Sequence, residues 1–520
     1  MTTEPEHAPE PEVQAPEVPW RRLAPGMLFV EPVRELIRFI PMLVVLIFAG
    51  RAGGSGPPWG LIGTAAVIAL GVSRWLTTRY RITPELVEVR RGLLQRKHVT
   101  VPRDRVRTVD VSAHPLQRVL RLVKVEIGTG TSHEHAEAVK LDGLPAAAAA
   151  SLRVELLHRK AVSPVVDAPE PVETVLSRLD RGWVKYAPAT LSGVVTAAFL
   201  IGFAWRILNE AHLNPVQIGA VRRGLDYLEG TPIWIDVLWL GALVIVVVTV
   251  LSVAGYVLSF WNYQLTRHDG GTLQVSRGLL TTRATSIEER RLHGAQRSEP
   301  LLIRFARGAR LQAIATGLRQ RGSERGSALL VPPAPLSVVT AVEAAVLGSA
   351  TIGTAKLTQH GPAARRRRYT RALGLTAVCV AGLWALHFLA GWPIAAAAIA
   401  VLGFPCAALL ARDRYANLGH TLTEGRLVTR VGSLVRRRST IAVAGVIGVT
   451  LRQSVFQRRS GLISLTATTA AGAQRYEVPD LTQRAAVDLA VVLVPAFATV
   501  AGTPGTALLR DGPGVSRLPA

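Results

Sequence analysis

The longest apolar stretch of the chain runs from Ile233 to Phe260 and frames the interpretation of the rest. It holds one early acid, Asp236, and no Lys or Arg. At about 1.5 Å of rise per residue, a helix of this length crosses a hydrocarbon core of roughly 30 Å with some tilt. A helix that is apolar on every face over this length is unusual in a water-soluble protein. The pattern therefore predicts a membrane protein.

Other apolar stretches predict further membrane helices, which pair into hairpins. They are Leu36–Gly50, Trp59–Trp75, Tyr186–Leu208, Ala372–Ala390 and Trp392–Leu410. Turn-rich connectors such as Gly391-Trp392-Pro393 join the two members of a pair. Together with the first stretch, these segments predict six membrane helices in three hairpins.

Between the hairpins the pattern changes to an alternation of apolar and polar residues, which is typical of strands. In the first polar segment it appears at 80–91, 99–102, 106–111 and 123–127. A turn at Thr83-Pro84-Glu85 separates the first two runs, and Leu144–Leu157 predicts a closing helix. Short strands followed by one helix predict a small β domain.

The polar segments share a spacing, which indicates an internal repeat. Each has a glycine before a strand: Gly92, Gly278 and Gly432. The position 25 residues after each glycine is Gln117, Ile303 or Gln457, and the next is always arginine: Arg118, Arg304 and Arg458. The apolar residue before these positions also recurs. The register predicts one fold used three times, with Ile303 as a departure in the second copy.

A helical hairpin followed by Tyr80-Arg-Ile-Thr, Arg91-Gly92-Leu93-Leu94 and Gln117-Arg118 resembles the bacterial membrane-flanked PH-domain family, in particular its multi-copy YdbT-like members. The resemblance implies PH-like domains of two nearly orthogonal antiparallel sheets closed by a C-terminal helix. It implies no catalytic residues. The predicted fold class is thus an α+β membrane protein, in which three transmembrane hairpins alternate with three PH-like β-barrel or sandwich domains.

The predicted organisation begins and ends with disordered tails, acidic and Pro-rich at 1–33 and Gly/Pro-rich at 499–520. The hairpins are predicted at 34–76, 185–260 and 371–411. The PH-like domains are predicted at 77–160, 261–348 and 412–498, and linkers at 161–184 and 349–370, the second of them basic.

Charge indicates a partner and an orientation. The chain has 520 residues, 49% of them hydrophobic, and a formal net charge of +24. Such an excess suits nucleic acid or an anionic membrane face, and the apolar spans favour the membrane. Basic residues flank the β segments at Arg74, Arg79 and Arg81 and at Arg365–Arg368. The positive-inside rule therefore places the β segments and both termini in the cytoplasm at the cell membrane, although Arg222 and Arg223 lie in a far-side loop.

Basic clusters near the membrane are the candidate lipid- or partner-binding residues. A basic side chain near an anionic surface gains about 1 kcal/mol. The clusters are Arg96-Lys97, Arg365-Arg366-Arg367-Arg368 and Arg436-Arg437-Arg438. The alternative interpretation is a solvated face whose charges only set topology. For Gln117-Arg118 and Gln457-Arg458, hydrogen bonding at strand ends is favoured over ligand contact.

The sequence offers weak signals for metal or catalytic chemistry. His133-Glu134-His135 lies in a predicted hairpin tip without a third ligand, and His114 and His293 lie in polar loops. Cys379 and Cys406 both lie in apolar stretches, which argues against a disulfide framework or a thiolate site. No Walker A, nucleophile-elbow or His-Glu-x-x-His motif occurs. We therefore expect no enzyme, no cofactor and no metal.

The leading expectation is a non-enzymatic polytopic scaffold that presents its PH-like domains to anionic lipid or protein partners, one of which could be a single-copy membrane-flanked PH-domain protein. A transporter or channel component is the alternative, suggested by Asp236 and Arg206 within spans. A nucleic-acid binder is disfavoured because the segments lack a recognition helix or an aromatic platform.

Overall fold

The computed structural model describes most of the chain, with gaps. The described residues are 19–35, 59–83, 85–92, 96–103, 106, 108–128, 139–157, 173–190, 192–210, 232–268, 271–316, 328–391 and 393–496. The chain divides into two compact units. Unit 1 comprises 1–106, 113–127 and 138–156, and unit 2 comprises the remainder. Each unit is described by itself.

Unit 1 holds an antiparallel sheet, a β-hairpin and several helices, one of them at 27–35. The sheet order is β1-β2-β3-β4, with β1 Arg21–Arg22, β2 Arg79–Ile82, β3 Leu86–Arg91 and β4 Lys97–Pro102. Helix α2 (Trp59–Thr77) precedes β2. The short α3 (Pro115–Val119) precedes the paired strands β6 (Leu122–Gly128) and β7 (Val139–Pro145), and α4 (Ala146–Leu157) follows. Val87 and Val89 of β3 are buried in its core.

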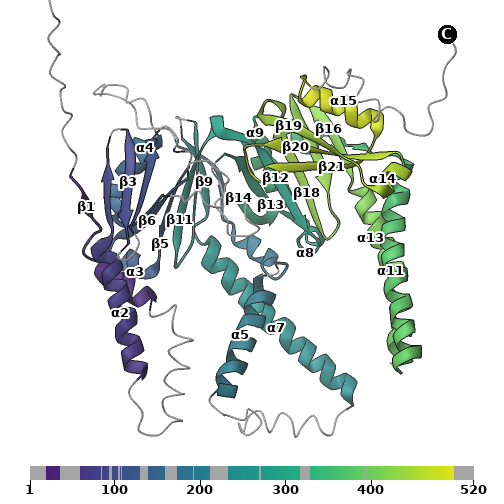
Figure 1. The fold of residues 1–520 in the computed structure, drawn as a ribbon, viewed down its shortest axis with the longest axis horizontal. Coiled ribbons are helices and arrows are strands. Elements are labelled where there is room, and N and C mark those ends of the chain that lie inside the picture. The colour runs from purple at the N-terminus through teal and green to yellow at the C-terminus, as the bar shows by residue number, and fades with distance from the viewer. Residues whose placement is uncertain are drawn as a thin grey trace, which may run out of the picture. The chain divides into compact units, whose positions relative to one another are not determined.

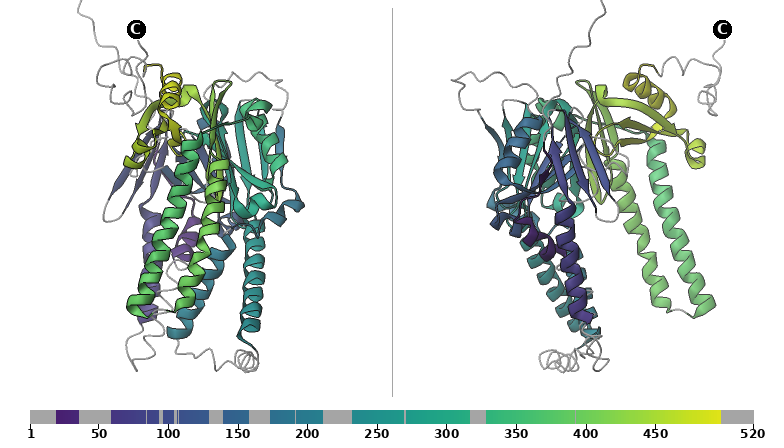
Figure 2. Two further views of the ribbon diagram at one scale, coloured as in Figure 1. Left: turned by 90° about the vertical axis from the view of Figure 1, so that its right-hand side faces the viewer. Right: turned by 60° about the vertical axis from the view of Figure 1, so that its left-hand side comes forward.

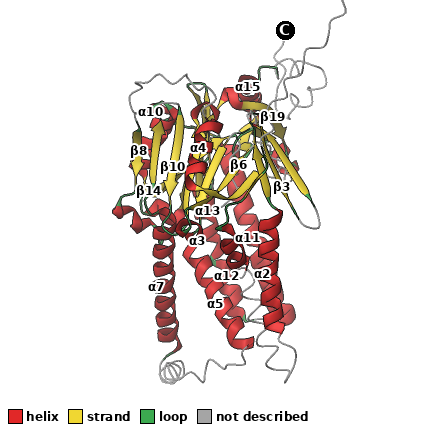
Figure 3. Cartoon of the chain, turned by 90° about the vertical axis from the view of Figure 1, so that its left-hand side faces the viewer, coloured by secondary structure: helices red, strands yellow, loops and turns green. Residues whose placement is uncertain are grey.

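The middle segment of unit 2 has its longest apolar helix directly before its main strands. After β8 (Thr174–Arg178), η2 (Arg181–Tyr186) and α5 (Ser192–Glu210), helix α7 (Ile233–Phe260) leads directly into β9. Helices α5 and α7 contact each other and cross in Figure 1, and Figure 3 shows α7 as an unbroken rod. The strands are β9 Gln264–His268, β10 Thr272–Arg277, β11 Thr282–Glu288, β12 Leu292–Pro300, β13 Gly308–Ala315 and β14 Leu329–Pro335, and the connecting helices are η4 Glu289–Arg291 and α8 Leu301–Phe305. Helix α9 (Leu336–Leu347) packs on β12, β13 and β14 and closes the core.

The third segment repeats this order of elements. Helix α10 (Ala350–Thr354) and β15 (Thr358–Gln359) precede α11 (Pro362–Ala390), which lies beside α13 (Gly403–Ala416) in both views of Figure 2. Helix α12 (Ile394–Val401) joins these two. The strands are β16 Gly419–Thr423, β17 Arg426–Val431, β18 Val435–Ala442, β19 Val446–Arg452, β20 Leu462–Thr469 and β21 Arg475–Thr482, and the helices among and after them are η5 Val443–Gly445, α14 Val455–Arg459 and α15 Gln483–Leu493. Helix α15 packs its Ala486, Leu489 and Leu493 into the core.

Continuous sheets run through unit 2. Strand β12 of the middle segment pairs with β18 of the third, with Gly294 opposite Ile441 and Pro300 opposite Val435. The sheet order is β14-β13-β12-β18-β17-β16-β15. In the same way, β5 (Thr108–Ala113), of which residues 108–112 belong to this unit, is the neighbour of β11, followed by β10, β9 and β8. The middle and third segments therefore share one continuous sheet.

The prediction of six transmembrane helices in three hairpins was wrong. Two described helices, Trp234–Phe260 and Pro362–Ala390, are long and apolar enough to cross a membrane. The apolar part of α2 covers Ile62–Thr77 and that of α5 covers Gly193–Phe203, which are shorter apolar helices. The predicted sixth span divides at Leu402 into α12 and α13, since a turn ends one helix and Gly403 begins the next. The predicted first span at 36–50 lies outside the described residues.

Candidate functional site

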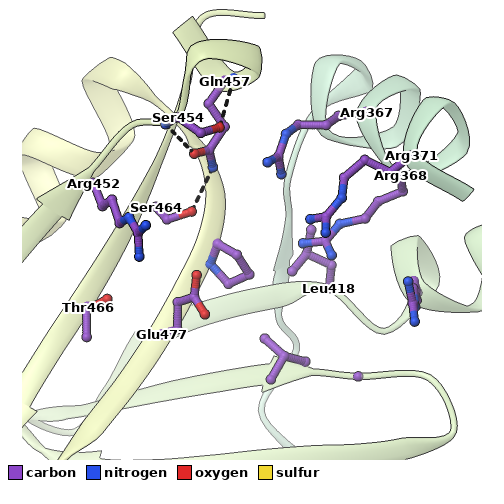
Figure 4. A pocket seen from close by; sticks show the side chains of 14 residues that line it. Arg367, Arg368, Arg371, Leu418, Arg452, Ser454, Gln457, Ser464, Thr466 and Glu477 are labelled. Carbon is purple, nitrogen blue, oxygen red and sulfur yellow. Dashed lines mark hydrogen bonds between the residues drawn. The ribbon is translucent and has the colours of Figure 1, made fainter. Parts of the chain in front are cut away.

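The third segment contains a cavity of about 470 Å³ that is lined by arginines. One wall is α11 with Arg367, Arg368 and Arg371. The opposite wall is formed by β19, β20 and β21 (Figure 4). The full lining is Arg367, Arg368, Arg371, Arg414, Leu418, Val431, Gly432, Arg452, Ser454, Gln457, Ser464, Thr466, Glu477 and Pro479. Because α11 is a candidate membrane span, the arginine wall belongs to the first turns of that span.

A buried carboxylate holds two of these arginines. Asp480 is fully buried and forms ion pairs with Arg367 and with Arg368, in the latter case at 2.8 Å between Oδ2 and Nη2. Its backbone adopts a positive φ of 60° at an irregularity in the β20–β21 pairing. Removing charges from water costs several kcal/mol per ion unless they are paired. The pairs therefore fix the start of α11 against β21.

Gln457 connects this cluster to α14. Its side-chain amide donates to Asp480 Oδ1 at 3.0 Å and to Ser464 Oγ at 2.8 Å, while its Oε1 accepts from the backbone N–H of Ser454. Ser454 in return caps α14 by accepting from the Gln457 N–H. All polar groups of the glutamine are thus engaged in structure.

Three further guanidinium groups carry the charge that is available to a ligand. Arg371, Arg414 and Arg452 are exposed and have no carboxylate partner among the described residues. With Arg367 and Arg368 the cluster has five positive groups, against the carboxylates of Glu477 and Asp480. An excess of positive charge in a partly enclosed space attracts phosphate, which guanidinium groups bind through charge-assisted hydrogen bonds.

Unit 1 has a second basic cavity, of about 700 Å³, at the corresponding place in its own strands. Its lining is Leu23, Glu31, Arg34, Thr77, Thr78, Arg91, Gly92, Arg96, Lys97, Lys124 and Asp142. Gly92 corresponds to Gly432, and Lys124 to Ser464, in the order of strands and in spacing from the repeated glycine. Here the acids pair with neighbours, as Arg34 does with Glu31 at 3.8 Å. Again five basic side chains outnumber two carboxylates.

In the middle segment the same place is filled by apolar side chains. Ile303 stands where the others have glutamine, is fully buried and belongs to the same core cluster as Tyr186, Tyr256 and Tyr263. The Tyr256 hydroxyl donates to the Pro333 carbonyl at 2.8 Å, and Pro333 corresponds to Asp480 in the strand register. Burial raises the pKa of Tyr263, which lies near Tyr256. In the third segment, burial raises the pKa of Tyr476 to about 12.

The predicted basic clusters have different surroundings. Arg96 and Lys97 line the cavity of unit 1, whereas Arg365 and Arg366 are exposed and outside the cavity of the third segment. Arg436 pairs with Glu299 of β12 at 3.2 Å, and Arg438 is buried and donates to the carbonyls of Ile352 and Ala355. Arg437 is exposed. Arg436 and Arg438 therefore belong to the joint between β12 and β18.

The repeated glycines share one backbone geometry. Gly92, Gly278 and Gly432 have φ of 115°, 110° and 104°. A Cβ at Gly278 or Gly432 would lie 2.0 Å from a carbonyl oxygen three residues on. Only glycine adopts this conformation without strain. The glycines therefore shape the turn before β4, β11 and β18.

The remaining repeat residues lie on short helices. Gln117 is buried and accepts from the His114 N–H at 3.1 Å, as part of a capping box at the start of α3. Arg304 contacts Asp413 at 3.3 Å and so links the middle segment to α13. Arg118 and Arg458 are exposed.

The weaker candidates form no site in the described part of the chain. His133-Glu134-His135 lies outside the described residues. In the described ranges no group of three His, Cys, Asp or Glu side chains is placed to hold a metal. Burial lowers the pKa of His293. Cys379 and Cys406 are free and exposed, and Asp236 lies in the first turn of α7.

Sequence reasoning missed Arg371, Arg414, Arg452 and Asp480. Arg371 could have been found, because it lies four residues after Arg367 and so on the same helix face. Arg452 and Asp480 lie on strands that begin 56 and 85 residues after the end of α11, and only the fold brings them together.

The comparisons identify the class of protein. The bacterial PH domain model matches residues 29–160 and 370–497, which together make up half of the chain. The chain belongs to this family.

Within the family it is YdbT-like. It is 20% identical over 343 residues to the UPF0699 transmembrane protein YdbT of Bacillus subtilis (strain 168), a match that covers 60% of this chain and 66% of that relative. The match thus spans just under two thirds of the relative's length. No solved structure matches the chain. The transmembrane relative and the two long apolar helices indicate a membrane-associated protein.

Proposed function

We propose that this membrane-associated protein binds the phosphate of anionic phospholipid headgroups in the arginine-lined cavity of its third segment. The observation that carries the proposal is the placement of Arg371, Arg414 and Arg452, which line one cavity and have no carboxylate partner among the described residues. Each basic group near an anionic lipid surface is worth about 1 kcal/mol. Arg371 belongs to the candidate span α11, which favours a lipid over a soluble anion.

The proposal extends to the arrangement in the membrane. The middle segment counts as a third PH-like copy, because its elements follow the same order as those of the matched segments. The protein acts by binding rather than by catalysis, as a multi-pass scaffold with its PH-like domains and termini in the cytoplasm. Support for that orientation is the basic run Arg365–Arg368 at the start of α11.

The direct test is titration of the full chain, purified in neutral detergent, with a short-chain phosphatidylglycerol. The variant carrying both Arg371→Ser and Arg414→Ser removes two cavity charges, and we expect its affinity to fall about 30-fold, from about 1 kcal/mol per group. The matched control carries Arg365→Ser and Arg366→Ser, which removes the same amount of charge from the start of α11, outside the cavity.

Calorimetry or native mass spectrometry gives the affinities. The proposal requires the control to bind nearly as tightly as the wild type. Equal losses in both double variants would mean that only net charge matters and would contradict a cavity site. A zwitterionic lipid that competes equally would do the same.

A further inference from the structure

The joint between the middle and third segments is a specific β-strand pairing. Seven residue pairs join β12 to β18, among them Gln296 opposite Ser439 and Arg297 opposite Arg438. Arg297 contacts Glu343 of α9 at 3.0 Å and Glu299 at 3.2 Å. Burial, with Arg297 nearby, lowers the pKa of Arg438 to about 10. The joint is thus a buried interface with its own charge pairing.

Strands β5 and β11 are also neighbours in one sheet, with polar contacts between them. In unit 2, Asp110 of β5 accepts from the Thr285 hydroxyl of β11 at 2.8 Å and lies 3.7 Å from Arg283. Strands β5 and β12 are of one type, which we call the fifth-type strand. Each of them is the strand that follows the first sheet of its segment. Strands β11 and β18 end the first sheet of the next segment. Each joint therefore pairs a fifth-type strand with the last strand of a first sheet.

Two strands of these types remain at sheet edges. Strand β19 follows η5 as β12 follows η4, and both have a register shift two residues into the strand. The pairing with β20 leaves β19 at the end of the order β19-β20-β21. Strand β4 ends the order β1-β2-β3-β4, with no further strand neighbour in the described ranges.

The exposure of the edge strands differs from that of the joined ones. Ser439, Thr440 and Ile441 in β18 are buried, whereas Lys97, His98 and Thr100 in β4 are exposed. In β19, Ile447 is 68% exposed. Strand β19 reads Val-Ile-Gly-Val-Thr-Leu-Arg, with a single charge at its end. An apolar edge of this kind is a template for pairing with another chain.

We propose that the β19 edge of one copy of this chain pairs with the β4 edge of a second copy, which continues the sheet from copy to copy as β12 and β18 continue it within one. The occupant is a second copy because the chain itself supplies both strand types. The register of β12 on β18, carried over, places Thr450 opposite Val99 and Gly448 opposite Val101. A contact between two different surfaces gives open or ring-shaped assemblies.

Charge predicts how the contact responds to salt. The same register places Arg452 opposite Lys97, so two positive side chains face each other across the pairing. Like charges opposite each other destabilise a strand pair, and salt screens exposed charges. Association through this edge therefore strengthens as salt rises, unlike binding of an anion.

The test is site-specific crosslinking between two differently tagged chains in one membrane. Both chains carry Cys379→Ala and Cys406→Ala. One carries Thr450→Cys and the other Val99→Cys, and a short bis-maleimide joins thiols that face each other. We expect an intermolecular product that increases with salt.

Two controls fix the meaning of the result. Gln296→Cys with Ser439→Cys in one chain reports the internal joint and shows that the fold is intact. Glu85→Cys, exposed in the turn before β3, replaces Val99→Cys as the control for random collision. An internal product together with an intermolecular yield no higher than for Glu85→Cys overturns the proposal. So does capture of the Thr450→Cys chain by a different PH-domain protein in place of its own copy.

Discussion

The middle and third segments have the same order of strands and helices, yet they differ at the base of the fold, by which we mean the region around Ile303 in the middle segment and Gln457 in the third. In the middle segment, Ile303 and three tyrosines fill the base with apolar surface. In the third, Gln457 and Asp480 hold Arg367 and Arg368. The same arrangement of strands and helices therefore holds either an apolar core or a charged cavity at this place. The residue at the repeated position is isoleucine in the first case and glutamine in the second.

The apolar base is the more stable design, and the charged base is the one that leaves room for a ligand. Burying apolar side chains gains free energy directly. A buried ion pair gains little net stability, although breaking it is costly. We infer that the third segment gives up stability for an anion site, and the following predictions test this contrast.

The largest expected effect comes from Asp480→Asn. It leaves Arg367 and Arg368 without their buried carboxylate, and removing one partner of a buried pair costs about 3–5 kcal/mol. Amide hydrogen exchange of β20 and β21 in the full chain should report this loss. Asp488→Asn, on the exposed face of α15, is the control and should change little. Similar protection in both variants would show that the ion pairs do not hold the base.

A converse change, Ile303→Gln, should cost the middle segment about 2–4 kcal/mol. It removes buried apolar contacts and places a polar amide in an apolar core, which costs free energy. The neighbouring Leu302→Gln, at a half-exposed position, is the control. Hydrogen exchange of β13 and β14 measures both. If Ile303→Gln were as mild as the control, the base of the middle segment would not depend on apolar packing.

A further expected effect is a loss of stability in acid that is confined to the third segment. Burial and the nearby His420 lower the pKa of His360 to about 4. Its Nδ1 donates to the Pro479 carbonyl at 2.8 Å, so its Nε2 accepts from His420 Nδ1 at 2.9 Å when both rings are neutral.

Because the folded pKa is below the ordinary 6.5, the folded state binds the proton less readily than the unfolded state. This contribution is complete above about pH 6.5 and is lost as the pH falls towards 4, by up to about 1.4 kcal/mol per pH unit. His360→Gln should flatten the pH dependence of exchange in β21. An unchanged profile between pH 6.5 and 4 would refute the assignment.

Local patterns in the sequence predicted local structure well. The alternation at 80–91 predicted β2 and β3, the run at 233–260 predicted α7, and the glycine spacing marked three turns of one geometry. Membership of the bacterial PH domain family was also predicted correctly.

Features that depend on distant residues or on helix length could not be predicted in this way. Apolar composition at 392–410 suggested a span, but the turn at Leu402 divides it into α12 and α13. Arg436 and Arg438 looked like membrane-facing charge, yet β18 pairs with β12 and places Arg436 against Glu299. The cavity required residues of α11, β19 and β21 to meet, and no short motif encodes that meeting.

Lipid binding in the arginine-lined cavity is tested by mapping where a photoactivatable phosphatidylglycerol, with its reactive group on the headgroup, attaches to the full chain in vesicles. We expect attachment to the start of α11 and to β19, around Arg371 and Arg452, and its loss in the Arg371→Ser and Arg414→Ser double variant. Attachment only near the exposed Arg365 and Arg366, unaffected by the double variant, would contradict it.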